Sequence, residues 1–213
     1  CENETKILSK LNNPLITKYY KSIREGQNLY IIMEFMDNGD LYGLYKASKT
    51  LKMPIEEERL FDIFIKAMKC LSYIHSKKIV HRNIKLKNLF LNVDGELKLG
   101  DFCMSAAFID KKENNNNIEN FNENENNAIK ESVIGDVICE QTIIGTPICM
   151  SPEMMNQTKY DLKTDVYSMG VSFFELCFWN PPRDLRRYHG NIIHIDLPIQ
   201  YNKNIYSQEL IEI

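Results

Sequence analysis

The chain has 213 residues, of which 44% are hydrophobic and 26% are charged, and its formal net charge is −3. These values are ordinary for a globular protein of one large or two small domains, and the slight acidic excess argues against nucleic acid or an anionic membrane as a partner. No run of about 18 apolar residues is present, which predicts no membrane span. The six cysteines include no C-x-x-C pair. We therefore expect reduced thiols and an intracellular location, cytoplasmic with the nucleus as an alternative.

The first part of the chain predicts a helix followed by a hairpin. Residues 2–11 carry apolar side chains at helical spacing. Two runs rich in Ile, Leu and Tyr, 15–21 and 29–35, flank the polar stretch 24–28. A turn between two such runs is typical of a β-hairpin.

Three helices are expected in the remainder. Asp40 is a candidate N-cap for a short helix that begins at the next residue. Residues 56–75 have apolar side chains every three or four positions, which predicts an amphipathic helix. Residues 164–178 are apolar almost all the way round, so we expect a buried helix there.

Two further segments complete the prediction. Residues 89–91 and 97–99 flank an Asp-Gly pair, which is a strong hairpin signal. Residues 111–130 are rich in Asn and Glu and poor in apolar side chains, which predicts a disordered insertion. A short helix and strands followed mostly by helices indicate an α+β fold.

The most informative motif is His81-Arg82-Asn83-Ile84-Lys85-Leu86-Lys87-Asn88, followed by Asp101-Phe102-Cys103. It resembles the catalytic loop H-R-D-x-x-x-x-N and the metal-binding turn D-F-G of protein kinases. Asn83 stands where that family has its catalytic Asp, and Cys103 stands where it has Gly.

Four other stretches resemble kinase segments in the expected order. Residues 32–36 resemble the strand that enters the hinge, 145–147 and 151–153 the end of the activation segment, and 165–170 the helix that anchors the catalytic loop. We therefore identify the chain as a member of the eukaryotic protein kinases of Ser/Thr type. Residues 89–102 are similar to NIMA-related kinases, and translation-initiation-factor kinases are the second choice.

The resemblance implies a truncated protein-kinase-like fold. Residues 1–35 would be the C-terminal part of the small lobe, with helix C and the last strands. Residues 36–213 would be most of the mainly helical large lobe, incomplete at its C-terminus. The insertion at 111–130 would lie in the activation segment.

The resemblance also assigns the residues that handle ATP and Mg²⁺ (or Mn²⁺). Asn88 and Asp101 would bind the metal, and Lys85 would place a positive charge near the transferred phosphate. The contacts to ATP at the hinge would come from Met33, Glu34, Met36 and Phe90.

Three more assignments concern regulation and substrate. Glu4 is the candidate helix C glutamate that pairs with a small-lobe lysine, and Glu2 competes for the role. Thr142 is a candidate phosphosite that would dock on Arg82, against the alternative of an unmodified surface residue. Thr146 would lie in the substrate-binding loop. No Gly-rich loop or V-A-I-K lysine precedes Glu4, so we do not expect tight ATP binding by this chain alone.

The two departures from the family pattern leave two functions open. An amide at Asn83 can hydrogen-bond a hydroxyl but is not basic, so phosphoryl transfer to a protein Ser or Thr would be weak or lost. The alternative is a pseudokinase, which binds nucleotide or regulates a partner kinase. A Cys at 103 either restricts the turn and turns Asp101 from the metal, or adopts another allowed conformation without effect.

Overall fold

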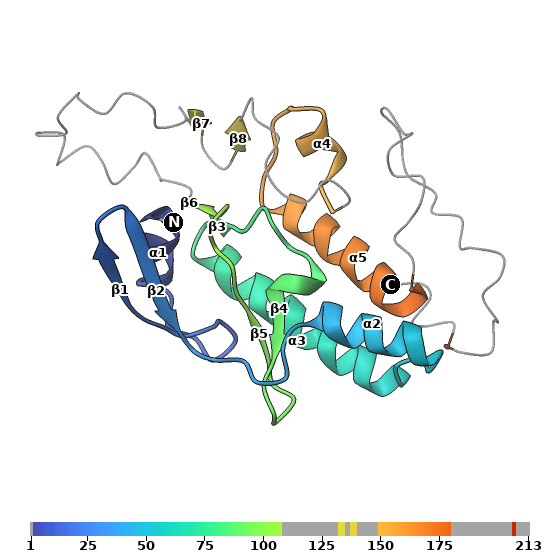
Figure 1. Ribbon diagram of the computed structural model, residues 1–213. Helices are drawn as coiled ribbons and strands as arrows, with labels where there is room; N and C mark the ends of the chain where they lie inside the picture. Colours follow the sequence, from blue (N-terminus) through green and yellow to red (C-terminus); the bar gives the residue numbers. More distant parts are fainter. Residues whose placement is uncertain (1, 108–131, 135–136, 140–148, 180–205, 208–213) are drawn as a thin grey trace, which may run out of the picture.

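In a computed structural model, the described residues are 2–107, 132–134, 137–139, 149–179 and 206–207 (Figure 1). The predicted insertion at 111–130 lies entirely outside these residues, as do Thr142 and Thr146. Two short strands, β7 (Ser132–Ile134) and β8 (Val137–Cys139), pair with each other.

The N-terminal part holds one helix beside an antiparallel hairpin (Figure 1). Helix α1 (Glu2–Leu8) ends three residues earlier than its apolar pattern predicted. Strands β1 (Tyr19–Glu25) and β2 (Asn28–Met33) pair in antiparallel register. The turn between them is tight and uses Gly26 at φ 60°, a left-handed conformation that glycine adopts at little cost.

The first hairpin strand begins later than the sequence predicted. The preceding segment instead contacts β5 (Leu97–Leu99): Leu99 N–H donates to the Leu15 carbonyl at 2.9 Å, and Thr17 N–H donates to the Leu99 carbonyl at 3.0 Å. Ile16, between these two residues, is 2% exposed. This segment therefore ties the N-terminal part to the strands beneath the catalytic loop.

Three long helices and one short helix form the other part of the described chain (Figure 1). Helix α2 (Leu41–Leu51) is capped by Asp40, whose Oδ1 accepts from Gly43 N–H at 2.8 Å, as predicted. Helices α3 (Glu57–Ser76) and α5 (Lys163–Phe178) match the predicted helices within one residue at each end. Helix α4 (Pro152–Met155) is one short turn.

Short strands and one 3-10 turn carry the functional loops between these helices. Strand β3 (Ile79–Val80) pairs with β6 (Ala106–Ala107), and β4 (Leu89–Leu91) pairs with β5 as predicted. The turn η1 (Leu86–Asn88) precedes β4 directly.

The core is continuous from α1 through β4 and β5 to α3 and α5. Its largest fully buried side chains are Phe102, Leu8, Leu41, Leu60, Leu71, Ile74, Ile84, Leu86, Leu89, Leu97 and Leu99. Three members, Ile84, Leu86 and Phe102, belong to the two motif segments, so packing fixes the backbone that presents the polar site residues.

Candidate active site

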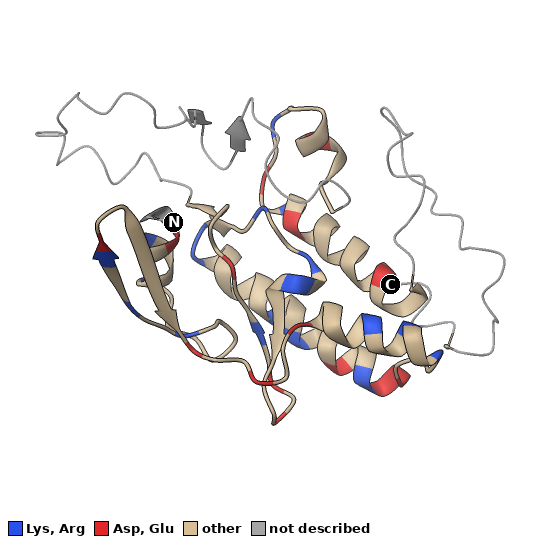
Figure 2. Cartoon of the chain, viewed as in Figure 1, with Lys and Arg blue, Asp and Glu red and all other residues tan. Residues whose placement is uncertain are grey.

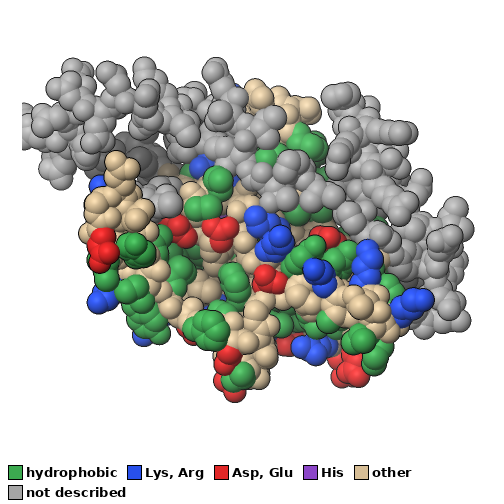
Figure 3. Space-filling view, in the orientation of Figure 1, with side chains coloured by type: hydrophobic (Ala, Val, Ile, Leu, Met, Phe, Trp, Pro, Cys, Tyr) green, Lys and Arg blue, Asp and Glu red, His purple; other side chains and the backbone are tan. Residues whose placement is uncertain are grey.

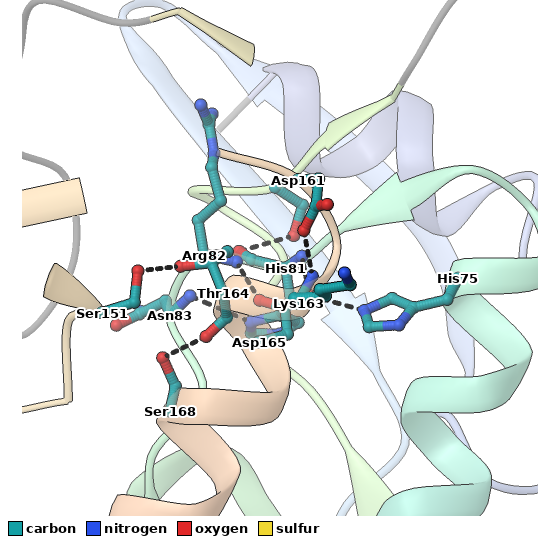
Figure 4. Close-up of polar contacts among 11 residues, drawn as sticks. His75, His81, Arg82, Asn83, Ser151, Asp161, Lys163, Thr164, Asp165 and Ser168 are labelled. Atoms are coloured by element: carbon teal, nitrogen blue, oxygen red, sulfur yellow. Dashed lines mark hydrogen bonds and ion pairs between the residues drawn. The ribbon is translucent and has the colours of Figure 1, made fainter. Parts of the chain in front are cut away.

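The catalytic loop is anchored on a buried carboxylate at the start of α5 (Figure 4). Asp165 is 0% exposed. Its Oδ2 accepts from His81 N–H at 2.8 Å, and its Oδ1 accepts from Arg82 N–H at 2.9 Å. The same Oδ2 lies 2.8 Å from His75 Nε2. A buried charge with several donors is stable only while these partners remain, so Asp165 fixes the loop to the helix.

His81 is a neutral structural imidazole. Burial lowers its pKa below the ordinary value. Its Nε2 lies 3.0 Å from the Gly100 carbonyl, and its Nδ1 accepts from Asn83 N–H at 3.3 Å. Both contacts fit the tautomer with the proton on Nε2. The ring also meets Phe102 edge to face, with centroids 4.8 Å apart. His81 therefore joins the catalytic loop to the metal-binding turn.

Two residues of this region adopt left-handed backbone conformations: Arg82 at φ 62° and Asp101 at φ 60°. Such conformations cost roughly 1–2 kcal/mol for residues other than glycine. Besides its bond to Asp165, Arg82 donates through Nε to the Met104 carbonyl and through Nη1 to the Tyr160 hydroxyl. These contacts offset the backbone cost and orient the loop.

Three polar side chains then meet at the centre of the site. Asn83 Nδ2 donates to Asp101 Oδ2 at 3.1 Å, and Asn88 Nδ2 donates to the Asn83 carbonyl at 2.7 Å. The Asn88 carbonyl accepts from Gly100 N–H at 3.0 Å. The residue in the base position thus contacts the candidate metal ligand directly. This contact requires a donor, which an ionised Asp would lack.

The donor set at this centre suits a hard divalent cation. Asp101 supplies a carboxylate, and the Asn88 amide nitrogen is bonded to Asn83, which leaves its oxygen for a cation. Magnesium is commonly held by one or two protein oxygens, with waters and phosphates completing its octahedron. No group of three or more His, Cys, Asp or Glu side chains suited to a metal occurs among the described residues. These two oxygens suit a cation whose remaining ligands are waters or phosphates.

Cys103 does not need the conformational freedom of glycine. Its φ is not positive, and the left-handed residue of the turn is Asp101. The Cys103 thiol hydrogen-bonds the Asp101 side chain, and burial together with that carboxylate raises the thiol pKa to about 11. The sequence left two interpretations of the cysteine at 103 open. In the structure Cys103 adopts an ordinary backbone conformation, as the second interpretation expects.

Replacing Cys103 by glycine is expected to lower the free energy of unfolding slightly, by about 0.5–1 kcal/mol. Glycine loses more backbone entropy on folding, and the contact between the thiol and Asp101 disappears. Urea unfolding of the parent, Cys103→Gly and Cys103→Ser measures the change, the serine variant retaining a donor. A clear gain in stability for Cys103→Gly would show that cysteine strains the turn.

Glu4 reaches the same turn from α1. It is 9% exposed, it bonds the backbone of Phe102, and it lies near Asp101. Burial, and secondarily the negative charge of Asp101, raises the pKa of Glu4 above its ordinary value of 4.5. Two carboxylates near one turn favour a cation between or beside them. Nothing is described of the Glu2 side chain, and the lysine partner of Glu4 remains a prediction.

The raised pKa of Glu4 gives a pH-dependent stability. A carboxyl whose folded pKa exceeds its unfolded pKa favours folding at low pH, and this contribution is lost as pH rises through the folded value. The stability of Glu4→Gln relative to the parent should therefore increase between about pH 4 and pH 7. Urea unfolding across that range measures it, with Glu58→Gln at an exposed position of α3 as control. A relative stability that falls with rising pH would contradict this assignment.

Of the residues assigned to ATP contacts at the hinge, Met33 ends β2, Glu34 and Met36 follow that strand, and Phe90 lies in β4. Glu34 N–H donates to the Lys18 carbonyl at 2.8 Å, and the Glu34 side chain forms an ion pair with Lys98 at 2.5 Å. Met36 is buried, whereas Met33 and Phe90 are half-buried. The Phe90 ring passes so close to Gly100 that a Cβ there would lie 3.0 Å from it. The absence of a side chain at Gly100 allows β4 and β5 to approach the metal-binding turn closely.

The structure brings together some of the predicted residues and leaves others undescribed. Lys85 is half-buried and precedes η1, and Asn88 N–H donates to its carbonyl at 2.9 Å. Thr142, predicted to dock on Arg82, and Thr146 lie outside the described residues.

Sequence reasoning missed two partners. No motif in the sequence marks His75, yet its Nε2 lies 2.8 Å from Asp165 Oδ2. Lys98 was given no role, yet it holds Glu34. The sequence offers one weak signal for the contact between His75 and Asp165. His75 lies at the end of an amphipathic helix, beside the polar turn at 77–78.

This geometry agrees with the family to which the sequence is matched. Residues 1–209 match the protein kinase domain family. The chain therefore belongs to the protein kinase family, and its α+β fold, with a catalytic loop carried between helices, is the fold of that family.

Its relatives are serine/threonine kinases, and several of them are NIMA-related (Nek) kinases. The chain is 30% identical to Mus musculus serine/threonine-protein kinase Nek1 over 174 residues, which cover 82% of the chain and 12% of that protein. It is 29% identical to Mus musculus Nek5 over 195 residues, covering 91% of the chain and 27% of Nek5. It is 31% identical to Mus musculus Nek4 over 217 residues, covering 100% of the chain and 24% of Nek4.

The chain thus spans only a small part of the length of these relatives. Protein kinases in general use ATP and a divalent metal ion and act on proteins. Within the described part of the chain, every helix is too short or too polar to cross a bilayer.

Proposed function

We propose that this chain is the part of a Ser/Thr protein kinase that holds ATP with Mg²⁺ or Mn²⁺ and presents it to a protein hydroxyl. Residues 1–35 would be the end of the small lobe and 36–213 the large lobe. The protein would act inside the cell, in the cytoplasm or nucleus. Its partners would be ATP and a protein substrate or a regulated kinase.

The observation that carries this proposal is the contact network of Asn83, Asn88 and Asp101. Asp101 and the Asn88 oxygen would bind the metal, which neutralises charge on the triphosphate. Lys85 would add a positive charge beside the transferred phosphate. The adenine would lie against Met33, Glu34, Met36 and Phe90.

Proton transfer is the weak step in this proposal. An amide at Asn83 can orient a substrate hydroxyl by hydrogen bonding, but its nitrogen does not accept a proton. General-base help contributes roughly 100- to 10,000-fold in enzymes. The transition state of phosphoryl transfer is loose, so the lower end of that range applies and slow transfer persists.

A pseudokinase is the second candidate, and one observation favours it. The Asn83 amide donates to Asp101 at 3.1 Å, which holds the metal-binding turn without a cation. Such a turn would suit a domain that signals through its conformation or through bound nucleotide.

Nucleotide binding tests the part that both candidates share. With Mg-ATP at about 100 times its Kd, the full-length protein is expected to gain about 2.7 kcal/mol of stability, seen as a higher Tm. Chelation of Mg²⁺ and the Asp101→Asn variant should each reduce the gain. An unchanged Tm with Mg-ATP in the parent protein would refute nucleotide binding.

A further inference from the structure

Three lysines and two tyrosines form an unusual surface beside the catalytic loop. We call the group of Tyr42, Tyr45, Lys46, Lys49 and Lys87 the lysine–tyrosine surface. The two tyrosine rings stack with centroids 5.5 Å apart. Lys46 Nζ lies 5.7 Å and Lys87 Nζ 4.9 Å from the centroid of the same ring, that of Tyr42. Two ammonium groups from different elements, α2 and η1, thus gather at one aromatic side chain.

This arrangement concentrates positive charge. The π face of each ring attracts a cation, which holds the lysines where their mutual repulsion would otherwise separate them. In the described part of the chain, no carboxylate pairs with Lys46 or Lys87. Both side chains are exposed. They are therefore available to an anion.

Lys49 differs from Lys46 and Lys87 because its ammonium group is held by hydrogen bonds within the protein. Its Nζ donates to the Tyr45 hydroxyl at 3.0 Å and to the Trp179 carbonyl at 2.6 Å. It also lies over the Tyr45 ring, 5.4 Å from the centroid. These contacts fix the end of α2 against the end of α5.

Two acidic side chains on adjoining segments of the described chain, Asp40 and Glu175, leave Lys46 and Lys87 without an ion-pair partner. Asp40 caps α2 by accepting from Gly43 N–H at 2.8 Å. Glu175 on α5 is half-buried; burial raises its pKa, and the nearby charge of Lys49 partly opposes that rise. Neither forms an ion pair with Lys46 or Lys87. The surface keeps its excess of positive charge.

The position of this surface links it to the proposed substrate site. Lys87 lies within η1, immediately before Asn88, whose amide donates to the Asn83 carbonyl at 2.7 Å. Figure 2 shows basic residues on both η1 and α2, and Figure 3 shows lysine and arginine side chains gathered over these elements on one face. An extended peptide with its hydroxyl at Asn83 would pass within reach of these side chains.

We infer that the lysine–tyrosine surface binds an acidic residue of the protein substrate, a carboxylate or a phosphorylated side chain close to the acceptor Ser or Thr. This inference rests on the proposed function, since it takes Asn83 as the position of the acceptor hydroxyl. The paired lysines supply the charge, and the Tyr42 ring fixes their spacing.

Peptide binding to the full-length protein, measured by fluorescence anisotropy without nucleotide, tests the inference. The probes are a serine peptide flanked by glutamates, the same peptide with glutamines, and one with a flanking phosphoserine. The glutamate peptide is expected to bind more tightly than the glutamine peptide. Lys46→Gln and Lys87→Gln should each reduce that preference by about 2- to 5-fold, and added salt should weaken it. Comparison of the glutamate and phosphoserine peptides identifies the preferred anion.

Lys77→Gln is the matched control, because it removes the same charge from an exposed position at the end of α3. Equal affinity for the glutamate and glutamine peptides would overturn the inference. So would an equal loss of preference in Lys77→Gln and Lys87→Gln, which would show a general charge effect. The binding assay does not measure turnover, so it is independent of a separate phosphorylation assay. A protein that is inactive in that assay but still prefers acidic peptides would refute only the proposed activity. An active protein without that preference would refute only this surface.

Discussion

Replacing Asn83 by aspartate is expected to raise the initial rate of peptide phosphorylation by the full-length protein about 100-fold. A carboxylate restores the proton acceptor that the amide lacks, and the loose transition state keeps the gain near the lower end of the range for general-base catalysis. The same change removes the donor that bonds Asp101 at 3.1 Å and places two carboxylates there. We therefore also expect a lower Tm without metal and a larger stabilisation by Mg²⁺.

The matched control for this variant is Asn92→Asp. It introduces the same charge at the turn between β4 and β5, where the Asn92 side-chain oxygen accepts from Glu96 N–H at 2.8 Å. An aspartate there keeps the acceptor, so rate and metal dependence should stay at the parent values. If Asn83→Asp is no faster than the parent, Asn83 does not limit the reaction.

Removing the Asp165 carboxylate is expected to cost about 3–5 kcal/mol of folding free energy in Asp165→Ala. The carboxylate is 0% exposed and accepts from two backbone N–H groups, those of His81 and Arg82. Each buried donor left without an acceptor costs about 1–3 kcal/mol. Urea unfolding of the chain measures the loss, and the catalytic loop should exchange its amide hydrogens faster in the variant.

Asp161→Ala separates this effect from the general loss of an aspartate. Asp161 is half-buried, and its Oδ1 accepts from Lys163 N–H at 2.7 Å just before α5. Losing such a contact typically costs about 1 kcal/mol. An Asp165→Ala variant no less stable than Asp161→Ala would contradict the anchoring role given to Asp165.

Periodicity predicted the helices well because their burial is one-sided or complete. Residues 56–75 were expected as an amphipathic helix, and α3 spans Glu57–Ser76. The predicted helix at 164–178 is α5, Lys163–Phe178. Its buried serines bond within the helix, as Ser172 does by donating to the Ser168 carbonyl at 2.8 Å. Such bonding satisfies the buried hydroxyl groups, so small polar residues can lie in an apolar helix.

Strand limits were predicted less well because they depend on distant partners. Residues 15–18 were predicted as the start of the hairpin, but Leu15 and Thr17 hydrogen-bond Leu99 instead. A local pattern indicates extended backbone and cannot choose its neighbour. The hairpin of β4 and β5 was predicted correctly because its Asp-Gly turn fixes the pairing locally.

The sequence motifs predicted which residues form the candidate site. They did not predict the contacts between those residues. The spacing of Asn83, Asn88 and Asp101 indicated a shared function, but only the fold reveals that the Asn83 amide donates to Asp101. The contact between His75 and Asp165 joins residues ninety positions apart. Side chains so distant in sequence meet through helix packing, which no local pattern specifies.

The proposed function depends most on Asn83, Asn88 and Asp101, which connect the catalytic loop to the metal-binding turn. A crystal structure of the full-length protein with Mg²⁺ and a non-hydrolysable ATP analogue tests it most directly. We expect the Asp101 carboxylate and the Asn88 side-chain oxygen to bind the metal, with Asn83 beside it. A structure in which both side chains point away from a cleft that holds neither metal nor nucleotide would contradict the account.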